Sequence, residues 1–196
     1  MAGDDVVYGD EQFIHLMGRE YNKPHENNIL DGYIVIGDEK IEFQRRTILN
    51  SRLSVLMPES FVIMPLELAE KKYPAIQRPE EIYTNNETTV NFCVSLKNDI
   101  ATNKDIPHAK DLIQQAVMRM NAGSSVINSE IIEVSGINIA YFDFCSAALD
   151  MDIYNMMFFL SVDNRIVVGS FNCPWQNMDA WKPVIEQMFE TVEMVK

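Results

Sequence analysis

The sequence of 196 residues is poor in the residues and motifs on which most catalytic and metal sites depend. Its three cysteines, at positions 93, 145 and 173, are odd in number and form no C-x-x-C pair, which argues against a disulfide framework and a zinc ribbon. Only three histidines are present, and the motifs G-x-S-x-G, H-E-x-x-H, G-x-G-x-x-G and the P-loop are missing. We therefore predict a non-enzyme with no catalytic residue, no metal and no cofactor.

Long apolar runs and positive charge are also scarce. No apolar stretch approaches the roughly 20 residues that span a bilayer, and the first residues, MAGDDVVYGDE, are acidic where a signal peptide would be basic and then apolar. The 29 acidic and 16 basic residues give a formal charge of −13, which repels nucleic acid. We therefore expect a cytoplasmic protein with no membrane span and no nucleic-acid partner.

Apolar residues make up 47% of the chain, which is enough for one sizeable core. Residues 1–30 are polar and mixed, and NKPHENN at 22–28 is typical of a turn-rich linker. We interpret residues 1–30 as an N-terminal appendage and residues 31–196 as a single α+β domain.

Alternating apolar and polar residues predict most of the strands. The predicted strands are 89–96, 126–134, 137–146, 153–162 and 165–171, and the alternation is clearest in 89–96. A further hairpin is predicted where YIVI and KIEF flank the turn that begins at Gly37. The strands after residue 126 are separated by short turns, so we expect an antiparallel meander. Residues 154–162 are apolar on both faces, which predicts a central strand covered from both sides.

Helical spacing of apolar residues predicts a helix at 107–121 and another at 183–194, with Pro183 in its first turn. A short helix is expected at PLELAEKKY, residues 65–73. We expect these helices to pack on both faces of an antiparallel sheet, in an α/β/α sandwich.

The phrase LSVLMPESF at 53–61, a strand running into Pro58 and then Phe61, resembles the opening signature of the PsbP-like, Ran-binding Mog-type and DcrB-like fold family. The order of elements over residues 50–196 is similar to that family. The resemblance implies a helix–sheet–helix sandwich and a protein that binds partners rather than catalyses, and it carries over no catalytic residue. The long N-terminal segment and the absence of a secretion signal depart from many relatives.

Twelve methionines are more than usual, and methionine either fills irregular cores or lines adaptable grooves. The candidate groove residues are Met156, Met157, Trp175, Met178 and Trp181. The first hypothesis is a binding module that captures a protein or peptide partner. The alternatives are a small-ligand-binding protein with a pocket between sheet and helix, and an enzyme with an unrecognised site.

Cys173 raises a separate question of reactivity. It ends a predicted strand just before Pro174, with Trp175 and Trp181 close behind. A reactive thiol needs a neighbouring base, and the position of His108 at the start of a predicted helix does not place it beside a thiol. We interpret Cys173 as structural, because it ends a buried strand where a proline stops the pairing.

Overall fold

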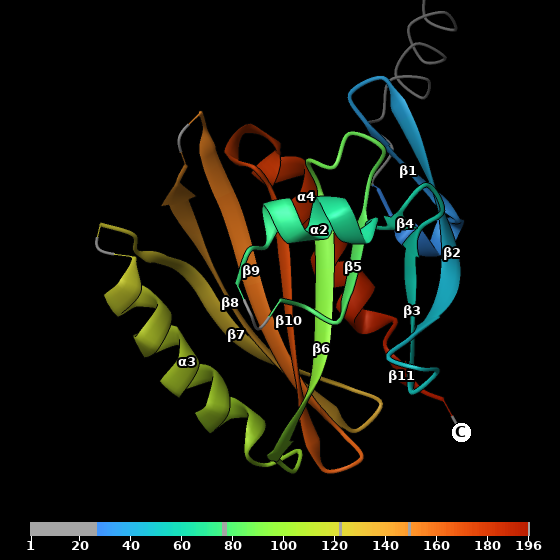
Figure 1. Cartoon of the computed structure of the whole chain (residues 1–196). Coiled ribbons are helices and arrows are strands. Elements are labelled where there is room, and N and C mark those ends of the chain that lie inside the picture. Colours follow the sequence, from blue (N-terminus) through green and yellow to red (C-terminus); the bar gives the residue numbers. More distant parts are fainter. Residues whose placement is uncertain (1–26, 76–77, 122, 149, 196) are drawn as a thin grey trace, which may run out of the picture.

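The computed structural model describes residues 27–75, 78–121, 123–148 and 150–195, which form two antiparallel sheets with helices around them (Figure 1). The helices are η1 (Ile29–Asp31), α2 (Leu66–Lys72), α3 (Ile106–Met120), η2 (Trp175–Asn177) and α4 (Met178–Glu190). The strands are β1 (Tyr33–Ile36), β2 (Glu39–Ile48), β3 (Leu53–Pro58), β4 (Val62–Ile63), β5 (Glu81–Thr84), β6 (Asn91–Ile100), β7 (Val126–Val134), β8 (Ile137–Ala147), β9 (Asp152–Val162), β10 (Arg165–Pro174) and β11 (Glu193–Met194). None of the helices within these residues is long and apolar enough to cross a membrane.

The larger sheet has seven strands in the order β4-β5-β6-β10-β9-β8-β7, and the smaller sheet has four in the order β1-β2-β3-β11. The predicted meander is confirmed, because β7, β8, β9 and β10 follow one another across the larger sheet. The strand expected to be central, β9, lies inside the sheet between β10 and β8. The predicted hairpin is also confirmed as β1 and β2.

The two faces of the larger sheet are covered differently. On one face, α3 packs over Phe142 and Phe159, and α2 packs through Ala69 over Ile82 and Cys93. On the other face lie α4 and the smaller sheet, which share one apolar core with β6, β8, β9 and β10 (Figure 1). The α+β class is confirmed. Because a second sheet shares the layer of α4, the chain is richer in strand than expected, and the α/β/α sandwich is not confirmed.

Packing along β9 explains why residues 156–160 are apolar at every position. Met156, Phe158 and Leu160 face the core shared with α4, whereas Met157 and Phe159 face α3. Successive side chains of a strand point to opposite faces, so a stretch of strand with cover on both sides favours consecutive apolar residues.

The C-terminal helix differs from the prediction at both ends. It begins at Met178 rather than near Pro183, because the 3-10 turn η2 runs directly into it. Pro183 therefore lies inside α4 and has no N–H to donate to the preceding turn. The helix ends at Glu190, and the last two residues of the predicted range instead form β11, which pairs with Leu53 and Ser54 of β3.

The strands that were not predicted are short. They are β4, β5 and β11, with two, four and two residues, too few to show a period of two. Pro58 ends β3, as expected for a residue without a donor.

Residues 1–26 of the predicted appendage lie outside the described residues. Of the remainder, Ile29 is buried, at 1% exposure. Its backbone N–H donates to Oε1 of Gln187 over 2.9 Å, and Nε2 of Gln187 donates to the carbonyl of Asn27 over 3.0 Å. Residues 27–29 are therefore held against α4.

Candidate binding cleft between α2 and the seven-stranded sheet

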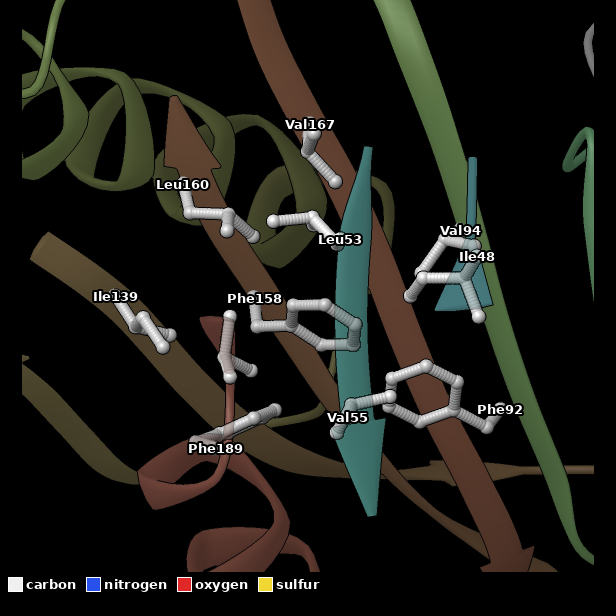
Figure 2. A pocket seen from close by; sticks show the side chains of 11 residues that line it. Ile48, Leu53, Val55, Phe92, Val94, Ile139, Phe158, Leu160, Val167 and Phe189 are labelled. Carbon is white, nitrogen blue, oxygen red and sulfur yellow. The ribbon is translucent and has the colours of Figure 1, made fainter. Parts of the chain in front are cut away.

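A small hollow lies in the core between the two sheets (Figure 2). Its volume is about 10 Å³, roughly the space of one water-sized sphere. Its lining is wholly apolar, with Phe92, Phe158 and Phe189 around it and Leu53 and Val55 of β3 beside them (Figure 2). A water there would find no polar partner, so the hollow is a packing void rather than a ligand site.

A much larger hollow, which we name the α2 cleft, opens on the other face of the larger sheet. Its volume is about 770 Å³, within the range of small-molecule and peptide sites. It lies between α2, the β5–β6 turn, the β8–β9 hairpin loop and the ends of β9 and β10. The residues that line it are Leu68, Lys71, Lys72, Tyr73, Thr88, Thr89, Ala148, Asp150, Met151, Ile153, Asn172 and Pro174.

A row of polar side chains crosses four strands of the sheet beneath the α2 cleft and reaches the cleft lining at Asn172. The strand register places Thr84 opposite Asn91, Asn91 opposite Asn172, and Asn172 opposite Asn155. Thr84 Oγ1 donates to Asn91 Oδ1 over 2.8 Å, and Asn91 Nδ2 donates to Asn172 Oδ1 over 2.8 Å. Thr84 and Asn91 are buried, so these bonds satisfy groups that would otherwise be costly to bury.

The row ends at the hydroxyl of Tyr73. Asn172 Nδ2 donates to the Tyr73 oxygen over 3.4 Å, and the Cys93 thiol donates to it over 3.5 Å. The Tyr73 hydroxyl and the Cys93 thiol can each donate to the other, so the hydroxyl proton of Tyr73 can serve a ligand when the thiol is the donor. Burial raises the pKa of Tyr73 above its ordinary value, so it stays protonated. Burial also raises the pKa of Cys93, which keeps the thiol protonated and unreactive.

Two lysines stand on the α2 side of the cleft. Leu68, Lys71 and Lys72 lie three and four residues apart, so they share one face of the helix. Lys72 Nζ donates to the carbonyl of Thr88, and neither lysine makes an ion pair with any described residue. Lys72 stays partly exposed, but desolvation of its ammonium lowers its pKa. The chain has 29 acidic residues, yet in the part that the structure describes none of them is paired with either lysine.

The five residues of the groove hypothesis lie in different places. Met156 is fully buried and Trp181 is 5% exposed, and Trp181 packs on Phe61 and Phe171, with ring centroids 5.9 and 5.8 Å apart. Met157 faces the opposite side of the sheet, toward α3. The structure therefore does not gather the five on one surface.

Of the remaining two, Met178 packs partly buried against the core. Trp175 is 38% exposed, with its ring 6.5 Å from that of Tyr154. A role for the five in binding stays a prediction. The residues of the α2 cleft were missed because they come from four separate segments, although Leu68, Lys71 and Lys72 could have been read as one helical face.

A second polar cluster lies on the α4 side of the sheet, around the fully buried carboxylate of Asp143. Its Oδ2 accepts from Tyr154 over 2.7 Å and from Lys182 Nζ over 2.8 Å, and its Oδ1 accepts from the backbone of Asn128 over 2.6 Å. Burial raises the pKa of the nearby Glu186. Every oxygen of Asp143 is satisfied by the protein itself, so this cluster joins α4 to the sheet rather than forming an open site.

The described residues contain no group of three or more His, Cys, Asp or Glu side chains that could hold a metal ion. Cys173 is fully buried, and burial raises the pKa of its thiol to about 12. The expectation that it lies in a buried strand is therefore confirmed.

Comparisons with known proteins bear on the fold. No protein-family model matches the sequence, and no curated protein matches it. The solution structure of CyanoP, the cyanobacterial PsbP of Synechocystis sp. PCC 6803, superposes with a TM-score of 0.55 at 11% identity, over 82% of this chain and 96% of that one. LpqN of Mycobacterium tuberculosis, described as involved in cell envelope biogenesis, superposes with a TM-score of 0.51 at 10% identity, over 87% and 99%. The PsbP-like fold is thereby confirmed.

Proposed function

We propose that this protein is a non-enzymatic binding module that holds a segment of polypeptide in the α2 cleft. The observation that carries the proposal is the pairing of an apolar wall with a polar floor in one open hollow of about 770 Å³. The proposed setting is the cytoplasm.

The chemistry of the cleft suits a peptide. Leu68, Met151, Ile153 and Pro174 offer apolar contact on its walls, and Asn172 offers an amide at its floor. A bound peptide brings apolar side chains together with main-chain N–H and C=O groups, which must keep hydrogen-bond partners when they leave water. A purely apolar or purely polar hollow would meet only one of these needs.

Exposed Met151 gives the wall an adaptable element. The residue is 51% exposed. It lies on the β8–β9 hairpin loop, in which the N–H of Ala148 donates to the carbonyl of Met151 over 3.1 Å. Methionine has an unbranched, polarizable side chain that fits different partners. The net charge of −13 favours encounter with segments that are basic outside the cleft and disfavours anionic competitors.

A small organic ligand is the second candidate function, because the cleft volume also falls within the ~300–1,000 Å³ of sites for such molecules. Catalysis has weaker support. A nucleophile needs an adjacent base or a depressed pKa, whereas burial raises the pKa of Cys93 and of Tyr73.

The proposal is tested by filling the mouth of the cleft. The substitution Met151→Trp places a bulky ring on an exposed lining position, and Met120→Trp, at a 76% exposed site on α3, is the matched control. Random hexapeptides are applied to the immobilised full chain and the retained fraction is measured by mass spectrometry. We expect retention by the wild type and by Met120→Trp, and a loss of at least about fivefold by Met151→Trp. Equal retention by all three proteins, or none by the wild type, would remove the proposal.

A further inference from the structure

We infer that the segment held in the α2 cleft is the C-terminal end of a partner chain, with an apolar last residue and a free α-carboxylate that Lys71 and Lys72 bind. This inference rests on the proposed function and specifies its ligand.

The first support comes from two lysines of the cleft that form no ion pair with a described residue. Lys71 and Lys72 both line the cleft, and neither is paired with an acidic side chain of the described residues. Lys72 reaches only a neutral acceptor, the carbonyl of Thr88, and its ammonium is partly desolvated. An ammonium that has lost water gains most from an anion, and charge-assisted bonds are about twice as strong as neutral ones.

The second support is the polarity of the hydrogen bonds at the floor. The chain of donors runs from Thr84 through Asn91 and Asn172 to the oxygen of Tyr73. When the Cys93 thiol also donates to that oxygen, the Tyr73 proton is a donor at the cleft, whose lining includes Lys71 and Lys72. A cleft lined by these donors is matched by a ligand group that only accepts, and an ionised carboxylate is such a group.

The third support is what surrounds these donors. Leu68, Ile153 and Pro174 supply apolar surface within the same cleft, which fits the side chain that sits next to a terminal carboxylate. On the far side of the cleft, Asp150 is exposed at the hairpin loop. The cleft is thus basic on one wall and acidic on the other, which orients a peptide with its carboxylate toward α2 and any upstream basic residues toward the loop.

The test compares two pools of peptides that differ in one group. Both are hexapeptides with five random positions and Leu, Ile or Phe last; one pool ends in the free acid and the other in the C-terminal amide. Each is equilibrated with the immobilised full chain, and the retained peptides are quantified by mass spectrometry. We expect the acids to be retained at least about tenfold better than the amides, as the loss of a charge-assisted bond implies.

Three substitutions locate the carboxylate. We expect Lys71→Met and Lys72→Met each to reduce the preference for the acids by about fivefold, and Tyr73→Phe to reduce it about threefold, with retention of the amides unchanged. The matched control is Lys104→Met, an exposed lysine outside the cleft, which keeps the full preference. Thermal unfolding confirms that each variant is folded.

The outcomes separate the two proposals. If acids and amides bind equally, the carboxylate inference fails while peptide binding in the cleft stands. If amides that carry internal Asp or Glu bind as well as the acids, the lysines take a side-chain carboxylate and the inference is wrong. Dodecanoate is also added as a competitor. If it displaces every peptide at a concentration lower than the concentration at which any peptide binds, the cleft takes a small carboxylate and the inference is overturned. If neither pool binds, the proposed function fails with it.

Discussion

The ring of Phe158 on β9 fills the space above Gly169, the residue opposite it on β10. A Cβ at Gly169 would lie 2.0 Å from Cζ of Phe158, far inside van der Waals contact. The ring cannot move aside easily, because it packs between two other rings. Its centroid lies 5.2 Å from that of Phe92 and 4.9 Å from that of Phe189. Glycine at position 169 is therefore required by packing and not by a turn.

Replacing Gly169 by alanine should lower the free energy of unfolding by about 2–3 kcal/mol, since overpacking a dense core forces neighbours out of their preferred rotamers. Urea denaturation measures the change. Ser170→Ala, on the other face of the same strand, is the control and should have a much smaller effect. A Gly169→Ala variant as stable as the wild type would show that the Phe158 ring can relocate at little cost.

The Asp143–Lys182 ion pair predicts an asymmetric response to substitution. Lys182→Met leaves the buried carboxylate without its cation and should lower the free energy of unfolding by about 2 kcal/mol, less than for a fully buried pair because Lys182 is partly exposed. The double variant Asp143→Asn/Lys182→Met should recover part of that loss, because no bare charge remains buried. Lys40→Met, which breaks an exposed pair with Glu42, should change stability little. No recovery in the double variant would contradict this account.

Glu186 predicts a dependence of stability on pH. Burial raises its pKa above 4.5, with Glu130 and Asp143 adding to the rise while Lys182 opposes it. Below pH 4.5 both the folded and the unfolded chain hold the proton. As pH rises, the unfolded chain ionises first, so the contribution of this group to stability is lost as pH passes through the folded pKa.

Glu186→Gln removes this ionisation. The free energy of unfolding of the variant, minus that of the wild type, should therefore be larger at pH 7 than at pH 4. Urea denaturation at both pH values measures this difference. Glu190→Gln, at an exposed position near the end of α4, is the control. A stability difference from the wild type that is the same at both pH values would show that Glu186 titrates normally.

The three thiols should differ in reactivity. Cys173 and Cys93 are buried and Cys145 is partly exposed, and burial raises the pKa of Cys173 to about 12. Iodoacetamide at pH 8 should therefore modify Cys145 first, and the other two only after addition of denaturant. Mass spectrometry of proteolytic fragments identifies each site. Fast labelling of Cys173 in the folded chain would mark it as a reactive residue.

The sequence predicted those parts of the fold in which a local pattern is long enough to be seen. The four strands of the meander, β7 to β10, and helix α3 each have nine or more residues, which is long enough for a periodic or a continuous apolar pattern to be recognised. Strands β4, β5 and β11 have at most four residues, and their pairing depends on distant partners. The start of α4 was misplaced because Pro183 was taken as its first turn, although a 3-10 turn continues into the helix from residue 175.

The α2 cleft could not be predicted for a different reason. Asn91 and Asn172 bond to each other across 81 positions of sequence, and only the register between β6 and β10 brings them together. The methionines illustrate the same limit. Met156 and Met157 are neighbours in sequence yet face opposite sides of the sheet, so a groove that includes both cannot be inferred from their adjacency.

The order of strands also constrains how the chain assembles. The middle of the larger sheet joins β6 to β10, and the smaller sheet closes with β11 on β3. Neither pairing can form before the last 32 residues of the chain, from Arg165 onward, are present, because these residues contain β10 and β11. The long segments between β6 and β10 and between β3 and β11 must be brought together at their ends before these contacts stabilise the fold, which makes folding slow. During synthesis, β3 and β6 emerge with exposed edges and without these partners, so a nascent chain that stalls before β10 is at risk of aggregation.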